Sequence, residues 1–393
     1  MDPRTNPYTP NAGAQPPALV GRELELEAFD ILLDRLLAGY TEQSMLITGL
    51  RGVGKTVLLN QFESQARSHN WVTVEAEITK NESFATRMVH HARRTLLQLD
   101  LRERWGQRAR RAAAALRSFE LTVNPDGKLT LGWGIEPEAG LADSGQLTDD
   151  LTDLFVAIGE AAADAGRGVV FLFDEIHFLS LGELEALIAA LHKTVQRNLP
   201  ITLVGAGLPQ LPQLAGEAKS YAERLFRFPV IGRLDPVQAA AALEEPADRS
   251  GVRYHPDTLR AIYGYTEGYP YFLQEYGKIL WDRSPGPTIT PEDAIAAKPI
   301  VDQKLDESFF RVRVDRTTPA ELRYLRAMAE LGSEAQPARA VAELLDRTTT
   351  QLGPTRSALI DKGLLYTSRY GYAAFTVPQF DKYLRRTWPI ETP

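Results

Sequence analysis

One stretch of the sequence, residues 45–56, decides the fold, and it reads MLITGLRGVGKT. It opens with apolar residues and then runs into glycines, which is typical of a buried parallel strand that ends in a loop. The segment from Thr56 to Ala66 then has the spacing of a helix. Between strand and helix, Gly49 to Thr56 match the pattern G-x-x-x-x-G-K-[ST]. The sequence therefore predicts a strand, a glycine-rich loop and a helix, in that order.

The residue types of this loop suit a bound phosphate group. Glycines let the backbone wrap closely around an anion, and the amides at the start of a helix offer it positive partial charge. Lys55 would neutralise the β- and γ-phosphates, and Thr56 would ligate Mg²⁺. The bound nucleotide is expected to be ATP or ADP. The nucleotide-binding residues expected here are Gly49, Gly52, Val53, Gly54, Lys55, Thr56 and Val57.

A second apolar run, residues 169–173, ends in two acids, Asp174 and Glu175. This is the Walker B pattern, in which Asp174 would hold Mg²⁺ through water and Glu175 would activate the attacking water. The alternative is an acidic strand end that caps the next helix. For His177, two positions further on, we expect a structural role.

Strands and helices alternate around these two segments. Further strands are expected at residues 71–78, 201–204 and 226–231, and helices at residues 23–37 and 181–198. Such alternation predicts an α/β fold with a doubly wound parallel sheet. Because Pro229 lacks an N–H group, the strand that contains it fits only an edge of that sheet.

The interval between the strands at residues 71–78 and 169–173 is too long for a simple crossover. We expect an insertion at about residues 84–150. Residues 84–117 read as Arg-rich helices, and the alternation of apolar residues at 119–135, around the turn Asn124 to Gly127, predicts a hairpin.

The chain after Leu234 changes character. Helices opened by Asp or Pro follow up to about residue 300, and we expect them to form a helical lid. Three further helices and two short strands then predict a C-terminal winged helix-turn-helix. The expected boundaries are a mobile or surface-bound N-terminal extension (1–17), the core (18–234), the lid (235–300) and the winged helix-turn-helix (301–393).

Together these motifs resemble the AAA+ superfamily, and within it the STAND-like and initiator-like ATPases. The resemblance spans about residues 16–393 and implies that Val20, Gly21 and Arg22 pack on adenine. It also implies that Pro270, in a Gly-x-Pro element, lies near the base, and that Arg224 acts as an arginine finger.

The polar residue that such proteins carry after the strand at 201–204 is missing, since that strand runs into Gly205-Ala206-Gly207. The arginine that such lids usually carry is missing from the Gly268–Pro270 region as well. Slow hydrolysis, as in a switch, is therefore expected.

The charge of the chain is distributed unevenly. The whole carries 44 basic and 51 acidic side chains, whereas residues 301–393 carry 14 basic and 12 acidic ones. Contact with double-stranded DNA is expected through residues 338–376, where Thr350, Gln351, Thr355 and Arg356 and the wing residues Arg369 and Tyr370 stand. A second candidate is the stretch from Arg93 to Arg117, whose alternative is a solvated helix face.

The function that these features predict is a nucleotide-dependent ATPase switch that uses ATP and Mg²⁺ and acts by binding DNA or assembling on it. The alternative is a protein-interaction switch with weak hydrolysis, in which the winged helix and the Arg-rich insertion dock a protein partner or a second copy of the chain. A metabolic kinase is disfavoured, because the chain beyond the sheet reads as lid and winged helix. No apolar run is long enough for a membrane helix, so we expect no membrane contact and a cytoplasmic location.

Overall fold

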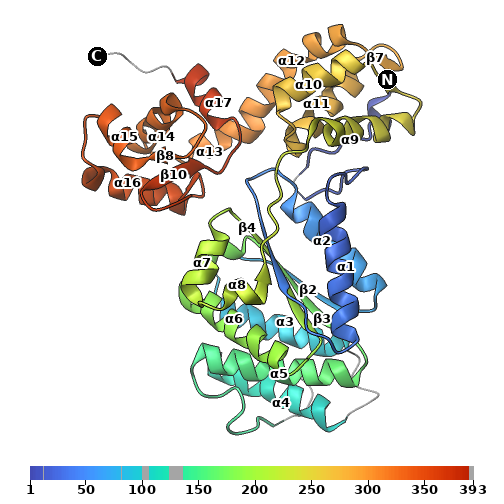
Figure 1. The fold of residues 1–393 in the computed structure, drawn as a ribbon, viewed down its shortest axis with the longest axis vertical. Helices are drawn as coiled ribbons and strands as arrows, with labels where there is room; N and C mark the ends of the chain where they lie inside the picture. Colours follow the sequence, from blue (N-terminus) through green and yellow to red (C-terminus); the bar gives the residue numbers. More distant parts are fainter. Residues whose placement is uncertain (12, 81, 100–105, 124–135, 389–393) are drawn as a thin grey trace.

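The computed structural model describes residues 1–11, 13–80, 82–99, 106–123 and 136–388. An α/β core fills the lower part of the view in Figure 1. A group of helices and a smaller C-terminal unit lie above it, on the side where the nucleotide-binding loop was expected.

Within the described residues, the core sheet has five parallel strands in the order β2-β3-β4-β1-β5. They are β1 (Ser44–Thr48), β2 (Val72–Glu77), β3 (Val169–Asp174), β4 (Ile201–Gly207) and β5 (Phe226–Arg227). Every residue of β1 and β4 is buried, as expected for strands that are covered on both faces. The doubly wound parallel sheet is confirmed, and the short β5 lies at its edge, two residues before Pro229.

Helices cover both faces of the sheet, as Figure 1 shows. Because successive side chains of a strand point to opposite faces, β3 contributes to two cores. Val170 and Leu172 pack with residues of the first two helices, whereas Phe171 and Phe173 pack with the helices of the other face. The helices of the first face are α1 (Glu23–Leu37) and α2 (Lys55–Ser68), and those of the second include α3 (Phe84–Gln98), α5 (Leu147–Asp164) and α6 (Leu181–Gln196).

The insertion is more helical than the sequence predicted. Helix α4 (Gln107–Val123) continues through Phe119, which is buried beside Ala112, Ala115 and Leu116. The strand expected at residues 119–123 is therefore wrong, because helical spacing from Ala112 onward outweighs the short alternation after Phe119. The remainder of the expected hairpin, residues 124–135, lies outside the described residues. Helix α5, which packs on α4 and α6, was not anticipated.

Beyond β4, two short helices lead to the sheet edge, α7 (Leu211–Ala218) and α8 (Ala222–Leu225). The chain then enters a group of helices that we call the lid: α9 (Pro236–Asp248), α10 (Pro256–Thr266), α11 (Pro270–Arg283) and α12 (Pro291–Leu305). Each begins with proline at its first turn, and capping boxes at Asp235 and Thr290 start α9 and α12. Two short parallel strands, β6 (Arg253–Tyr254) and β7 (Thr288–Ile289), pair with each other and join the segment between α9 and α10 to the segment between α11 and α12.

The N-terminal residues lie against the lid. A single 3₁₀ turn, η1 (Pro3–Thr5), is held there by the Trp281 indole N–H, which donates to the Asp2 carbonyl over 2.9 Å. Tyr8 is 1% exposed and belongs to the same hydrophobic core as the lid helices. In the structure, this extension is thus surface-bound.

A C-terminal module follows α12 through a π-helical turn (Asp306–Arg311) and α13 (Val312–Val314). Its helices are α14 (Pro319–Leu331), α15 (Ala338–Leu344), α16 (Thr349–Asp361) and α17 (Phe380–Thr387). Its strands, β8 (Gln336–Pro337), β9 (Leu365–Tyr366) and β10 (Tyr372–Phe375), form an antiparallel sheet in the order β8-β10-β9. Among the described residues, no helix is long and apolar enough to cross a membrane.

Candidate nucleotide-binding site

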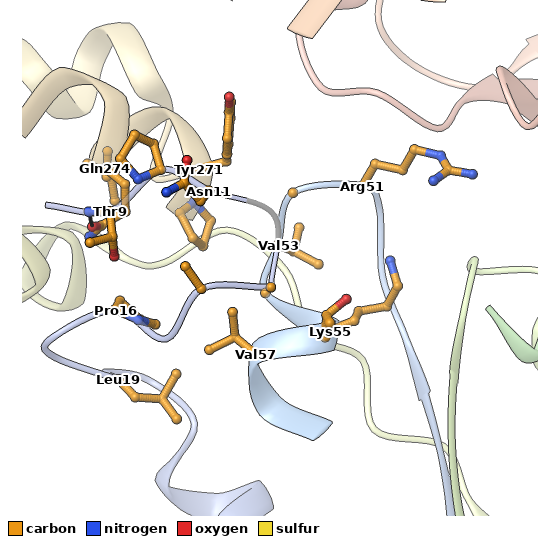
Figure 2. A pocket seen from close by; sticks show the side chains of 18 of the residues that line it. Thr9, Asn11, Pro16, Leu19, Arg51, Val53, Lys55, Val57, Tyr271 and Gln274 are labelled. Atoms are coloured by element: carbon orange, nitrogen blue, oxygen red, sulfur yellow. Dashed lines mark hydrogen bonds between the residues drawn. The ribbon is translucent and has the colours of Figure 1, made fainter. Parts of the chain in front are cut away.

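A cavity of about 460 Å³ opens where the sheet core, the lid and the N-terminal extension meet. Figure 2 shows side chains from all three parts around it. The loop after β1 and the two acids at the end of β3 form one end, and residues of the extension and of α11 form the other. Ser308, Phe309 and Arg313, between lid and C-terminal module, also line it.

The glycine-rich loop has the backbone that its sequence predicted. Gly52 and Gly54 have positive φ angles of 82° and 94°, a region that side chains with a Cβ disfavour. A Cβ at Gly49 would stand 2.4 Å from the Ile231 carbonyl oxygen, so only glycine fits there. Helix α2 then begins at Lys55, directly after the loop, and its N-terminus faces the cavity. This is the geometry of a phosphate-binding loop.

Lys55 lies within this loop and is buried. Its Nζ donates to the carbonyl oxygens of Gly49 and Leu50, each over 2.9 Å. Burial lowers the pKa of Lys55 to about 8, although the nearby carboxylates of Glu175 and Asp174 act in the opposite direction. A buried amine held among carbonyl oxygens is a strong point of attraction for a phosphate.

The two acids at the end of β3, Asp174 and Glu175, face the loop. The Thr56 hydroxyl donates to Asp174 Oδ2 over 2.5 Å, which places the two expected metal ligands side by side. Burial raises the pKa of Asp174. A hydroxyl and a carboxylate oxygen are the kind of ligands that Mg²⁺ takes beside nucleotide phosphates, so these residues fit that ion.

Glu175 has an unusual backbone, with a positive φ of 52°. Such a conformation is costly for a residue with a side chain. Its Oε1 accepts from Arg51 Nη1 over 3.0 Å. Its Oε2 lies 3.4 Å from His177 Nδ1, without the geometry of a hydrogen bond. Burial, with the cations Arg51, Lys55 and Lys80 nearby, lowers the pKa of His177 to about 3, so the ring is neutral.

The other expected nucleotide contacts divide into two groups. Val20, Arg22 and Pro270 line the cavity, whereas Gly21 packs against the side chain of Gln238. Arg22 is buried, and its guanidinium donates to the carbonyl oxygens of Val53 and Gly232. In the structure, this arginine therefore fixes the glycine-rich loop to the chain that leads into the lid.

Arg224, the expected arginine finger, is exposed on α8. It is not among the cavity-lining residues of the described chain. An arginine finger that acts on a second subunit would have to be exposed in this way, so the role stays a prediction.

Two cationic residues of the site were missed by the sequence analysis. Arg51 occupies a variable position of the loop motif, so the pattern gives it no role. Arg313 comes from the segment after α12, and its guanidinium lies 4.2 Å from the centroid of the Phe309 ring. Burial lowers the pKa of Arg313 to about 10, with Arg51 contributing. Arg313 lines the cavity, where a lid arginine could contact a bound phosphate. The cluster of arginines at residues 311–316 is the sequence feature that could have indicated this role.

The two regions expected to contact DNA lie at opposite ends of the molecule in Figure 1. In the insertion, Arg108, Arg111 and Arg117 pair with Asp164, Glu160 and Glu120. In the C-terminal module, Arg356 is turned inward and donates to the Tyr372 carbonyl over 2.7 Å. Thr350 and Gln351 are exposed at the start of α16, and Tyr370 is 99% exposed.

The site and the sheet together define a P-loop nucleotide-binding protein, and comparison with known proteins gives the family. Residues 18–204 match the model of the AAA ATPase domain, and residues 307–384 match a domain of unknown function, DUF8462. Residues 18–204 are thus an AAA ATPase domain, which makes the chain a P-loop ATPase of the AAA+ type. No curated protein sequence matches the chain.

Solved structures are similar to the chain over nearly its whole length. A Walker-type ATPase of Pyrococcus abyssi is 16% identical with a TM-score of 0.53, over 93% of this chain and 96% of that one. Cdc6p of Pyrobaculum aerophilum is 15% identical with a TM-score of 0.48, over 98% and 96%. The first likeness shows a shared fold.

Proposed function

We propose that the protein is an ATP-dependent switch that hydrolyses ATP slowly with Mg²⁺. Lys55 and the loop amides bind the phosphates, Thr56 and Asp174 hold the metal, and Glu175 activates water as general base. Bound Mg²⁺ would neutralise charge that develops on the phosphates. The units that move are the sheet core, the lid and the C-terminal module, for which the sequence predicted residues 18–234, 235–300 and 301–393.

The observation that carries this proposal is the position of Arg51. Its guanidinium pairs with Glu175, while its backbone N–H donates to the Thr376 carbonyl of the C-terminal module over 2.9 Å. A Cβ on Gly363, in the same module, would stand 2.9 Å from the guanidinium. One residue thus contacts both the general base and the output module, and it does so from within the phosphate-binding loop.

Further contacts hold the module against the core and the lid. Lys80 pairs with Asp361 over 3.1 Å, and Gln379 donates to the Tyr265 carbonyl over 2.8 Å. Lys382 pairs with Glu267 over 2.5 Å. The two ion pairs are largely exposed, so each adds little stability. We propose that a change in the loop shifts the equilibrium between docked and released module.

ATP would act on this arrangement through charge. The phosphates attract Arg51 and Lys55 and compete with Glu175 for the guanidinium, which frees the carboxylate for catalysis and loosens the docked module. Nucleotide binding then shifts the population of docked and released forms, because the two forms differ in their affinity for ATP.

We infer that the C-terminal module is a winged helix, with α16 as its recognition helix and Tyr370 in the wing, because its helices and short strands follow one another in the expected order. For its output we propose contact with double-stranded DNA, on the basis of the exposed polar start of α16 and the surplus of basic residues. The inward position of Arg356 favours the second candidate, a protein partner, because it removes one cation from the presumed DNA face.

ATPase activity with and without duplex DNA, over a range of protein concentrations, tests this proposal. DNA that stimulates turnover is titrated at ~50 and at ~200 mM salt. An apparent affinity for DNA that falls by orders of magnitude between these two salt concentrations supports binding through several phosphates. Turnover per subunit that rises with protein concentration supports an arginine contributed by a second copy, with Arg224 as the candidate. ATP turnover with no DNA binding at low salt points to the protein partner.

A further inference from the structure

The N-terminal extension has a place in the cavity that its sequence did not suggest. Residues 9–11 and 13–18 pass from the lid to the core along the cavity, and we call this segment the strap. Thr9, Asn11 and Pro16 of the strap line the cavity beside Tyr271 and Gln274 of α11, as Figure 2 shows.

Tyr8 anchors the strap in the lid. Its hydroxyl donates to the Leu243 carbonyl over 2.5 Å and lies 2.8 Å from the Tyr254 hydroxyl. A Cβ at Gly277 would stand 2.8 Å from the Tyr8 ring, so the glycine makes room for this side chain. A fully buried tyrosine with a satisfied hydroxyl is a firm attachment.

The other end of the strap is attached to α2, the helix that carries Lys55 and Thr56. Asn60 Nδ2 donates to the Gly13 carbonyl over 3.1 Å, and Gln15 Nε2 donates to Gln61 Oε1 over 2.6 Å. Gly13 has a positive φ of 71° and comes close to the Thr56 methyl group. The strap therefore spans lid and phosphate-binding helix in one short segment.

Polar groups of the strap and the lid meet inside the cavity. The Thr9 N–H donates to Gln274 Oε1 over 3.2 Å, and Gln274 is 9% exposed. The Thr9 hydroxyl is buried and has no hydrogen-bond partner among the described residues. A buried hydroxyl without a partner is costly, so a ligand that supplies one is favoured there.

The remaining walls at this end are apolar or aromatic. Pro16 and Leu19 lie on one side with Val57, and Tyr271 lies on the other, whereas the charged side chains of Lys55 and Arg51 point away from this group in Figure 2. An uncharged, flat group with hydrogen-bonding edges fits such a space, and a purine ring has this chemistry.

We propose that the strap binds the base of the nucleotide, with the Thr9 hydroxyl and the Gln274 amide as hydrogen-bonding partners of the adenine edge. This inference rests on the proposed function, since it assumes that the phosphates occupy the glycine-rich loop. It makes Thr9 and Gln274 specificity residues for ATP and assigns the extension a role in binding.

The test compares two ligands that share a triphosphate and differ in the base: MgATP and magnesium tripolyphosphate. Affinities are measured by calorimetry for the full chain, for Thr9→Val and for Thr5→Val. The control removes the same hydroxyl from an exposed residue of η1, where it donates to the Asp2 carbonyl. Thr9→Val should weaken ATP binding about five- to tenfold, the size expected for one lost neutral hydrogen bond. Tripolyphosphate affinity should stay unchanged, and Thr5→Val should change neither affinity.

Two results would overturn the proposal. If Thr9→Val lowers the affinities for ATP and for tripolyphosphate equally, the strap only positions the loop. If it lowers neither affinity, Thr9 does not contact the base. Tripolyphosphate binding by the variant also reports that its loop is folded. If the unaltered chain binds neither ligand, the proposed phosphate site itself fails, which is a different outcome.

Discussion

The two ends of the cavity are built in different ways. The phosphate end takes most of its charged side chains from two short stretches, residues 51–56 and 174–175, which lie at or just after the ends of two strands of one sheet. The base end joins Thr9 to Gln274, which are 265 positions apart in the chain, and it is uncharged. The comparison shows that anion binding is encoded locally, whereas base binding depends on how distant segments pack.

This difference also ranks the expected effects of substitution. Charges and general-base chemistry at the phosphate end contribute more free energy than a neutral hydrogen bond at the base end. Substitutions at the phosphate end should therefore give the larger losses, and the comparison fails if Thr9→Val costs as much as they do.

The largest effect is expected for Glu175→Gln. Removal of the general base should lower ATP turnover by ~10²–10⁴-fold, while ATP affinity is retained, because the amide keeps the size of the side chain. Steady-state turnover and calorimetry measure the two quantities. Glu217→Gln, an exposed position on α7, is the control. Equal turnover in Glu175→Gln and the unaltered chain would remove Glu175 from catalysis.

Lys55→Ala should reduce ATP affinity by about a hundredfold or more, because it removes the buried cation from the phosphate end. Lys193→Ala, an exposed lysine on α6, should bind ATP as the unaltered chain does. Calorimetry on both variants, with thermal unfolding as a check on folding, decides the point. Unchanged affinity in Lys55→Ala would refute the assignment of the phosphate site.

The depressed pKa of Lys55, about 8, gives ATP binding a pH dependence. Below this pKa the amine is charged, so the titration of Lys55 does not change the affinity for ATP there. Bound phosphates favour the charged form, so the pKa is higher in the complex and affinity falls as pH rises above ~8, by up to tenfold per pH unit. Calorimetry between pH 7 and 9.5 measures this fall. A flat profile would show that Lys55 does not titrate in this range.

A smaller effect is expected for Arg51→Ala. The phosphates of bound ATP already draw the guanidinium away from Glu175, so turnover at saturating ATP should stay close to that of the unaltered chain, whereas ATP affinity should fall modestly because a cation is lost from the loop. Turnover against ATP concentration separates these two quantities. A fall in turnover with unchanged affinity would instead make Arg51 a catalytic residue.

The sequence predicted the parts of the structure that are determined by neighbouring residues. The glycine-rich loop, the acidic end of β3 and the edge position of β5 all follow from local pattern and from the chemistry of glycine and proline. The strand expected at residues 119–123 failed because a short alternation of apolar residues also fits the side of a helix. Periodicity alone does not decide between them.

The remaining parts of the site depend on tertiary contacts. Arg51 occupies a position that the loop motif leaves open, and its partners Glu175 and Thr376 are 124 and 325 positions away. Arg313 and Thr9 reach the cavity only because the lid packs as it does. No spacing rule along the chain brings such residues together.

The central claim is that nucleotide at the loop controls the docking of the C-terminal module. Because the chain has no cysteine, Lys193→Cys on α6 and Tyr370→Cys in the module can carry a specific pair of fluorescent labels. Energy transfer between the two labels should change when MgATP is added, over the same concentration range in which ATP binds. In the labelled protein that also carries Lys55→Ala, MgATP should cause no change. The same transfer efficiency with and without saturating, bound ATP would contradict the account.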